Sequence, residues 1–160
     1  MIYTTFKQWM YRNGRPHTLA KILNRIQAIL HERGLIAEHL VTLEVMGRKS
    51  GKPIRFPLVV AAVDGQKYLV SMLGNDANWV QNVRSANGKA TLYHGIREDV
   101  LLTEVDVQLR ASILKAYLQK ADGARPHIPV HKDAPIAAFA KVAAEFPVFR
   151  LETMVTVEQQ

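Results

Sequence analysis

The feature that most constrains the fold is a run of short segments between residues 40 and 105 in which apolar side chains recur at every second position. Such alternation, rich in β-branched residues, is typical of strands that bury one face. The two-residue sequences Asp64-Gly65 and Asn87-Gly88 separate neighbouring segments, and both favour tight turns. Because the strands follow one another without regular helical crossovers, the pattern favours an antiparallel sheet over a doubly wound one.

Five or six strands with flanking helices are expected from the changes of hydrophobic period along the chain. The predicted strands cover residues 40–46, 55–63, 66–72, 89–93, 100–105 and 146–151, and the predicted helices cover 19–33, 79–86, 107–121 and 134–144. A small closed barrel suits this order because closure removes exposed strand edges. We expect an α+β protein with a single domain over residues 1–160, made of a helical segment (1–34) and a barrel (35–152).

The charge balance is the unusual part of the composition. The chain has 160 residues, with 21 Lys and Arg against 14 Asp and Glu, and a formal net charge of +7. An excess of this size favours an anionic partner, which leaves nucleic acid, a membrane surface and a phosphorylated cofactor as candidates. The chain contains no cysteine, which excludes disulfides and thiolate metal sites. It also shows neither a spanning apolar run nor a signal-peptide pattern, so a cytoplasmic location is expected.

The predicted helix at 19–33 has apolar residues at steps of three and four and a basic polar face that includes Lys21 and Arg25. Two interpretations remain open for it. An amphipathic helix of this kind covers the core of a soluble domain. A basic polar face also suits a helix that lies on a membrane surface, so peripheral membrane contact is kept as an alternative.

The segment from Gly47 to Arg55, with the sequence GRKSGKPIR, holds four cations and no acid between two predicted strands. Glycines allow backbone N–H groups to turn toward an anion, and arginine and lysine both bind phosphate. The spacing differs from a Walker loop, because Pro53 stands where Ser or Thr should follow the lysine. A phosphate cradle and a basic hairpin tip in solvent are the two interpretations.

A second candidate segment runs from Ser71 to Arg84, where a loop containing Gly74 leads into a short predicted helix. Helix N-termini attract anions. Trp79 is able to stack on a flat ring, and Asn82 is able to donate to ring carbonyl groups. The alternative is a core tryptophan and a capping asparagine, which is the commoner arrangement for either residue alone.

The order of these segments resembles the deazaflavin-dependent nitroreductase family of split β-barrel flavin and deazaflavin oxidoreductases. The resemblance spans residues 35–152. The motifs that carry it are Gly-Arg-Lys-Ser-Gly at 47–51, Phe56-Pro57-Leu58, the Asp64-Gly65 turn, Tyr68-Leu-Val-Ser71, Asn78-Trp79-x-x-Asn82 and Phe146-Pro-Val-Phe-Arg-Leu151.

The resemblance implies a small split β-barrel that binds coenzyme F420, a deazaflavin with a phosphate and an oligoglutamate tail. It also implies hydride transfer from ring C5 of the reduced cofactor to an electron-poor small molecule: a quinone, an activated alkene or a nitro compound. No nucleic acid and no metal are then required. The implied cofactor contacts are Arg48, Lys49, Ser50, Ile54, Arg55, Phe56, Pro57, Leu58, Val59, Ser71, Leu73, Gly74, Asn78, Trp79 and Asn82.

No catalytic side chain is identified by the resemblance, because the cofactor carries the chemistry and the protein supplies orientation and electrostatics. The acceptor still needs a proton, for which we take Tyr117, Tyr93 and His127 as candidates. Residues 118–160 contain no tyrosine, which departs from family members with a tyrosine cluster there and argues against bulky nitro substrates.

Other functions remain open at this level. The same barrel is able to bind FMN, and a non-enzymatic basic module would bind an anionic membrane or nucleic acid. Either a monomer or a homodimer suits the sequence.

Replacing both Arg48 and Lys49 by alanine is predicted to weaken F420 binding by more than ~2 kcal/mol, because charge-assisted phosphate contacts at a surface loop are lost. Titration of the variant with the cofactor measures this, and circular dichroism checks that the fold is intact. Unchanged affinity would remove the loop from the site.

Overall fold

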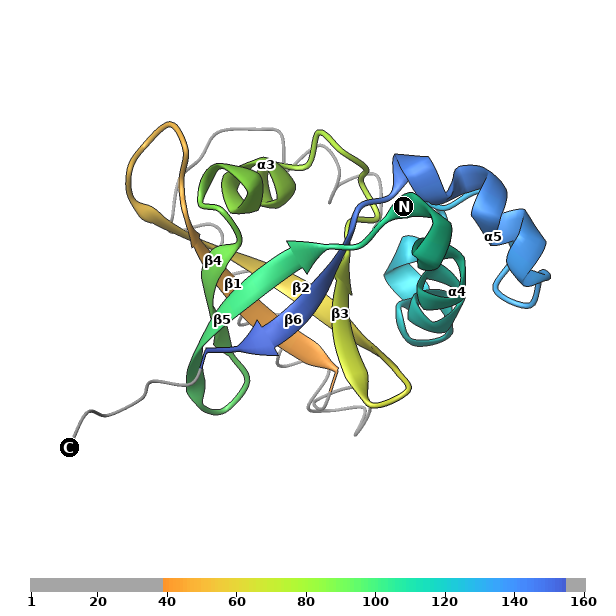
Figure 1. Ribbon diagram of the computed structural model, residues 1–160, viewed down its shortest axis with the longest axis horizontal. Helices are drawn as coiled ribbons and strands as arrows, with labels where there is room; N and C mark the ends of the chain where they lie inside the picture. The colour runs from red at the N-terminus through yellow and green to blue at the C-terminus, as the bar shows by residue number, and fades with distance from the viewer. Residues whose placement is uncertain (1–38, 155–160) are drawn as a thin grey trace.

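Residues 39–154 are described by the computed structural model, and they contain a closed barrel of antiparallel strands (Figure 1). Its strands are β1 (Leu40–Met46), β2 (Pro53–Val63), β3 (Gln66–Val70), β4 (Lys89–Tyr93), β5 (Arg97–Glu104) and β6 (Val148–Thr153). They are hydrogen-bonded in the order β1-β2-β3-β6-β5-β4, and β4 pairs back with β1. The prediction of a small antiparallel barrel is therefore confirmed.

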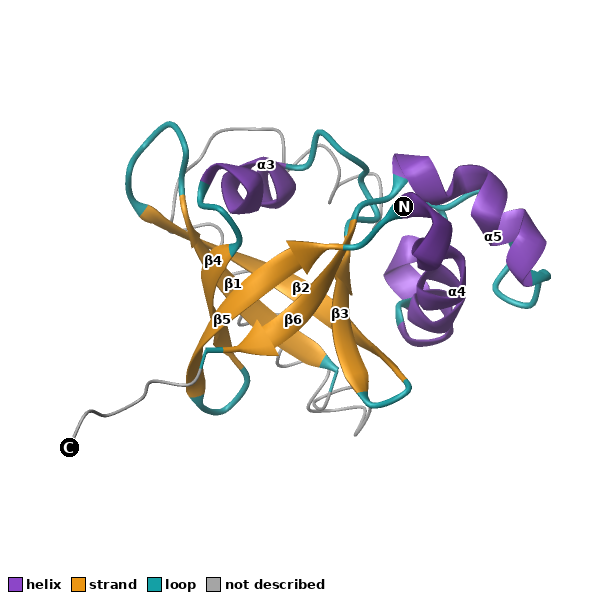
Figure 2. Cartoon of the chain, in the orientation of Figure 1, coloured by secondary structure: helices purple, strands orange, loops and turns teal. Residues whose placement is uncertain are grey.

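The helices lie at one end and along one side of the barrel (Figure 2). The helices of the described part are α3 (Asn78–Ser85), α4 (Arg110–Lys120) and α5 (Ile136–Val142), with short 3-10 turns η1 (Val107–Leu109), η2 (Asp122–Ala124) and η3 (Ala143–Glu145). The helix α3 caps the barrel end near the β1–β2 loop, whereas α4 lies beside β2 and β3 and α5 packs on α4. Between residues 39 and 154, no helix is long and apolar enough to cross a membrane.

Two apolar clusters hold these layers together. One fills the barrel, where inward-facing residues such as Leu43, Leu69 and Val100 pack against Val80 and Val83 of α3. The other lies between the barrel wall and the helices, and contains Leu114 and Leu118 of α4 with Phe139 of α5. Burying each such side chain contributes about 2 kcal/mol. Burial on both sides explains why most residues of β2 are apolar, since this strand lies between the barrel interior and α4.

The predicted elements match the structure with shifted ends. The last strand begins at Val148, two residues later than predicted, because Pro147 has no N–H to donate to the ladder. The helix α5 begins at Ile136, directly after Pro135, instead of at residue 134. The predicted first helix at 19–33 lies outside the described residues.

The turns expected from sequence occur where the backbone needs a left-handed conformation. Asp64 and Gly65 have φ angles of 51° and 76°, and Asn87 and Gly88 have φ angles of 55° and 81°. At Gly88 the space is also closed, because a Cβ atom there would collide with the backbone oxygen of Leu102. Leu102 in turn donates its N–H to the Gly88 oxygen at 2.8 Å. Only glycine meets both requirements at position 88.

We expect Gly88→Ala to destabilise the fold by at least ~2 kcal/mol, since it combines left-handed strain of roughly 1–2 kcal/mol with the collision at Leu102. Gly95→Ala is the matched control, because Gly95 has a φ of 90° but open space around it. Urea unfolding of both variants measures the difference. Equal losses in the two variants would show that the close approach at Leu102 costs nothing.

Candidate functional site

The β1–β2 loop is a tight, internally hydrogen-bonded turn. The Gly47 N–H donates to the Lys52 oxygen at 2.8 Å, and the Gly51 N–H donates to the Gly47 oxygen at 2.9 Å. Gly51 has a φ of 66°. A Cβ on Gly47 would lie 2.5 Å from Ser50 Oγ and 2.7 Å from Ile54 Cδ1, so a side chain at this position would require both of these side chains to shift. The glycines thus shape a tight loop whose two lysines, Lys49 and Lys52, are exposed.

Arg48 joins this loop to α3. Its backbone N–H and its Nη1 both donate to the Oδ1 atom of Asn82, at 3.2 and 2.8 Å. Its Nη2 lies 3.5 Å from Oδ1 of Asn78. The two segments singled out from sequence therefore lie in direct contact, although Arg48 and Asn82 are 34 positions apart.

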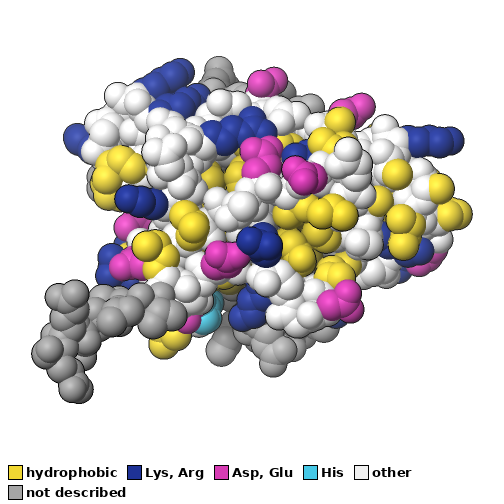
Figure 3. Space-filling view, viewed as in Figure 1, with side chains coloured by type: hydrophobic (Ala, Val, Ile, Leu, Met, Phe, Trp, Pro, Cys, Tyr) yellow, Lys and Arg dark blue, Asp and Glu magenta, His cyan; other side chains and the backbone are white. Residues whose placement is uncertain are grey.

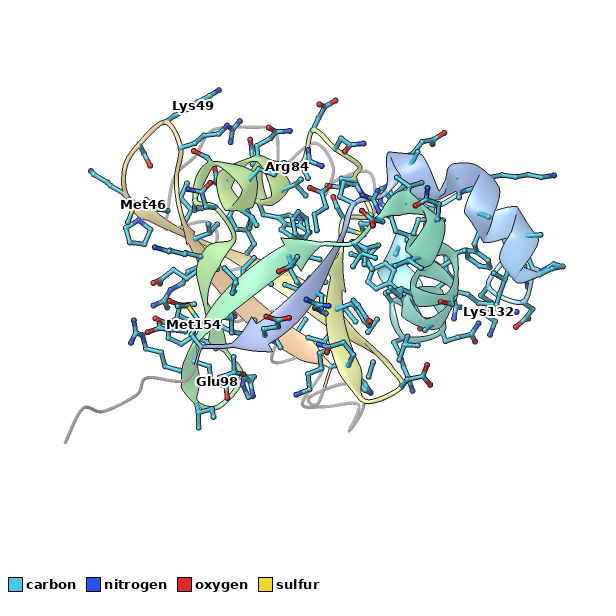
Figure 4. The ribbon with its side chains drawn as sticks, in the orientation of Figure 1. Met46, Lys49, Arg84, Glu98, Lys132 and Met154 are labelled. Atoms are coloured by element: carbon cyan, nitrogen blue, oxygen red, sulfur yellow. The ribbon has the colours of Figure 1, made fainter. Side chains whose placement is uncertain are left out.

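The positive charge of the loop is left uncompensated. Lys49 and Lys52 are exposed, and neither forms an ion pair with any carboxylate of residues 39–154. Lys49 points outward from the tip of the loop (Figure 4). In the space-filling view, Lys and Arg side chains gather at the corner of the molecule that carries this loop (Figure 3). An anion approaching this corner meets ammonium groups and the Ser50 hydroxyl.

The loop that leads from β3 into α3 is also fixed in place. The buried Ser71 hydroxyl donates to the Gly74 oxygen at 2.7 Å, and Gly74 has a φ of 85°. Gln81 donates to the Asn75 backbone oxygen at 2.7 Å, and Arg84 donates to the Asn75 Oδ1 atom at 3.0 Å. The polar face of α3 therefore holds this second loop as well.

Trp79 does not face solvent, which corrects the expectation that it stacks on a flat ligand. Its side chain is 4% exposed and lies in the barrel cluster, with its ring centroid 5.5 Å from that of Phe149. Asn82 is 2% exposed, and its oxygen is occupied by Arg48. The core tryptophan of the alternative interpretation is present, but the capping asparagine is not, because Asn82 lies within α3, which has no side-chain cap, and binds Arg48 instead.

The six positions implied along β2 divide between the two faces of the strand. Phe56 and Leu58 pair with the buried residues Leu43 and Val41, and so belong to the inner face together with Ile54. The residues of the opposite face are Arg55, Pro57 and Val59. The side chains of Pro57 and Leu58 lie on opposite faces of β2, and their contact with the ring stays a prediction.

Part of the inner set remains accessible. Phe56, Leu58 and also Leu73 are half-buried and pack against the cluster that contains Trp79. Arg55, by contrast, is already engaged on the outer face. Its Nε donates to Glu44 at 2.7 Å, its guanidinium lies 4.6 Å from the centre of the Tyr93 ring, and the hydrogen bond to Glu44 raises the pKa of Arg55.

The three proton-donor candidates lie in different parts of the structure. Tyr117 is 4% exposed within the helical cluster, and burial raises the pKa of its phenol far above the ordinary value. It is therefore excluded as a proton donor to a bound acceptor. Tyr93 lies beneath Arg55, and His127 is half-buried between η2 and α5, on the side of the barrel away from the β1–β2 loop (Figure 1).

A groove of about 440 Å³ lies between the β2–β3 hairpin, the end of β5 and the start of α4. Its walls include Asp64, Tyr68, Glu104 and Ile113. None of the residues expected to contact a cofactor lines it, so we do not assign it to the cofactor.

A network of polar side chains that the sequence did not reveal connects α3 to the start of α4. Arg84 donates to both oxygens of Glu104, at 2.5 and 3.1 Å, and Arg110 approaches Glu104 at 3.4 Å. Arg110 is buried and also donates to the backbone oxygens of Val105 and Ala143. No local pattern signals this network, because its members come from α3, β5 and α4.

Comparison with known proteins identifies the family. The family profile of the F420H(2)-dependent quinone reductases matches residues 20–125, well over half of the chain. The chain belongs to this family. It is accordingly an F420-dependent oxidoreductase, and the expected family, enzyme class and cofactor are confirmed. No curated protein matches the chain.

Solved structures show the same fold at low identity. A domain-swapped dimer is 19% identical and has a TM-score of 0.51, covering 83% of this chain and 98% of its own. The conserved hypothetical protein Rv2991 from Mycobacterium tuberculosis is 12% identical with a TM-score of 0.51, covering 77% of this chain and 78% of its own. An F420-H2 dependent reductase, FDR-A, is 19% identical with a TM-score of 0.48, covering 71% and 93%.

The donors of the β1–β2 loop suit a polyanionic cofactor. The loop offers the ammonium groups of Lys49 and Lys52, the Ser50 hydroxyl, and backbone N–H groups of Lys49 and Ser50 that bond to no other group of residues 39–154. It contains no carboxylate. Such a set neutralises phosphate or carboxylate groups without repelling them.

If Trp79 is a core residue, Trp79→Ala will reduce the free energy of unfolding by about 3–5 kcal/mol, and Trp79→Phe will cost less because most of the aromatic volume remains. Chemical denaturation of both variants measures this. A stable Trp79→Ala protein that lost only cofactor affinity would instead make Trp79 a ligand contact.

Proposed function

We propose that this enzyme transfers a hydride from reduced F420 to a small electron-poor acceptor, with a quinone as the first candidate. The observation that carries the proposal is the basic β1–β2 loop, held against α3 by Arg48 and carrying lysines without carboxylate partners in the described part of the chain. The family match supports the cofactor and, through the family's description, the quinone.

The cofactor would be bound by a basic surface and by an apolar surface. Lys49, Ser50 and Lys52 would hold the phosphate and acidic tail at the surface, where ammonium groups remain hydrated. Phe56, Leu58 and Leu73 would contact the ring, because they are half-buried apolar residues packed on the Trp79 cluster. When bound, reduced F420 supplies the hydride, and the protein contributes orientation and exclusion of water.

The acceptor proton is proposed to come from solvent. Tyr117 is shielded in the helical cluster, and the Tyr93 ring is covered by the guanidinium of Arg55. An electron-poor quinone is able to take this proton from water once it has been reduced. This arrangement requires no side chain to act as a general acid.

Titration of the purified protein with F420 and with FMN, followed by absorbance, tests the cofactor part of this proposal. We expect micromolar binding of F420 and none of FMN. Reoxidation of reduced F420 is then followed with a soluble quinone, an activated alkene and a nitroarene, and the quinone should react fastest. Binding of FMN alone would favour the flavin alternative. Salt-dependent binding to DNA or anionic vesicles without either cofactor would favour a binding module.

A further inference from the structure

Arg48 is the only cation of the β1–β2 loop whose donors are already used within residues 39–154. Its backbone N–H and its Nη1 converge on one oxygen of Asn82, at 3.2 and 2.8 Å, and its Nη2 reaches toward Asn78. Lys49 and Lys52 extend into solvent on either side of Ser50. The loop therefore contains one cation turned toward the protein and two turned outward.

The acceptor that Arg48 uses is buried. Asn82 is 2% exposed, so its amide oxygen has little access to water. Loss of a donor to a buried oxygen is unfavourable because water cannot replace it. Turning the Arg48 side chain toward a ligand would break the 2.8 Å bond to this oxygen and leave it only the backbone N–H at 3.2 Å, whereas turning a lysine toward the same ligand would break no side-chain hydrogen bond within residues 39–154. Energetics therefore favour a guanidinium that stays on α3.

Both loops beside the proposed cofactor surface depend on α3. Asn78 and Asn82 hold the β1–β2 loop through Arg48, while Gln81 and Arg84 hold the loop after β3 through Asn75. A single short helix thus sets the spacing between the basic loop and Leu73. Loss of the Arg48 contact would release the β1–β2 loop from α3 and leave the loop after β3 in place.

We infer that Arg48 is a positioning residue that clamps the β1–β2 loop to α3 through Asn82, and that Lys49 and Lys52 supply the charge that meets the anionic tail. The second half of this inference rests on the proposed function. The first half concerns the protein alone.

Hydrogen exchange of the cofactor-free protein tests the clamp. Arg48→Ala and Asn82→Ala should each speed exchange at the Gly47 and Gly51 amides by about tenfold or more, because the loop opens more often. Asn82→Asp should preserve protection, since it retains an acceptor oxygen for Arg48. Lys49→Ala should leave protection unchanged. Equal protection in Arg48→Ala and the wild type would overturn the clamp.

Binding of F420 at several salt concentrations tests the division of roles. Arg48→Lys keeps the charge but not the forked contact, so it should weaken binding about as much as Arg48→Ala, whereas wild-type affinity in Arg48→Lys would overturn the inference. Lys49→Ala and Lys52→Ala should each flatten the salt dependence, and Asn82→Ala should not. A flattened dependence in Arg48→Ala alone would assign the charge contact to Arg48 and overturn the inference.

A double-mutant cycle and a matched control complete the experiment. Arg48→Ala combined with Asn82→Ala should weaken binding no more than either change alone, and additive losses would show that the two residues act separately. Arg125→Ala removes an arginine that pairs with Asp122 on the far side of the barrel, and it should bind as the wild type does. If the wild type itself binds no F420, the proposed function fails, while the exchange result still decides the clamp.

Discussion

A closed barrel must fill its open ends, and the packing of α3 over one end is the contact on which the rest of this structure depends. Trp79, Val80 and Val83 enter the same cluster as the inward-facing strand residues. The helix has only eight residues, too few to be stable alone, so burial of this face is what keeps it folded. The barrel therefore sets the position of α3, and α3 in turn sets the position of the loops that are hydrogen-bonded to it.

The polar side chains of α3 hold the loops of the candidate site in place. Asn78, Gln81, Asn82 and Arg84 all make hydrogen bonds to one of the two neighbouring loops or to β5. Apolar burial thus fixes the helix, and polar contacts transmit its placement to loops that carry little apolar area of their own. A basic loop held in this way presents a fixed array of cations to a ligand, which lowers the entropy lost on binding.

The structure shows which of the cations behind the net charge of +7 are paired with acids and which are not. Many of the arginines are occupied by local partners, as Arg55 is by Glu44, Arg84 by Glu104 and Arg150 by Glu152. Lys49 and Lys52 belong to a segment without any acid. The loop at 47–52 contributes three cations and no acid to this excess, while residues 1–38 contain six Lys and Arg against two acids.

The sequence by itself determined the strands, the hairpin turns, the basic loop and the family, because each depends on residues that are neighbours along the chain. Alternation of apolar residues sets which side of a strand is buried, and Asn87-Gly88 sets a turn. Only the tertiary structure decided which cations are free and which aromatic rings are exposed. Arg48 was indistinguishable from Lys49 until Asn82, 34 positions later, came into contact with it. The sequence allowed Trp79 to be either a cofactor contact or a core residue, and it offered Tyr117 as a proton donor, yet both side chains are buried. Burial depends on elements that meet only when the barrel closes.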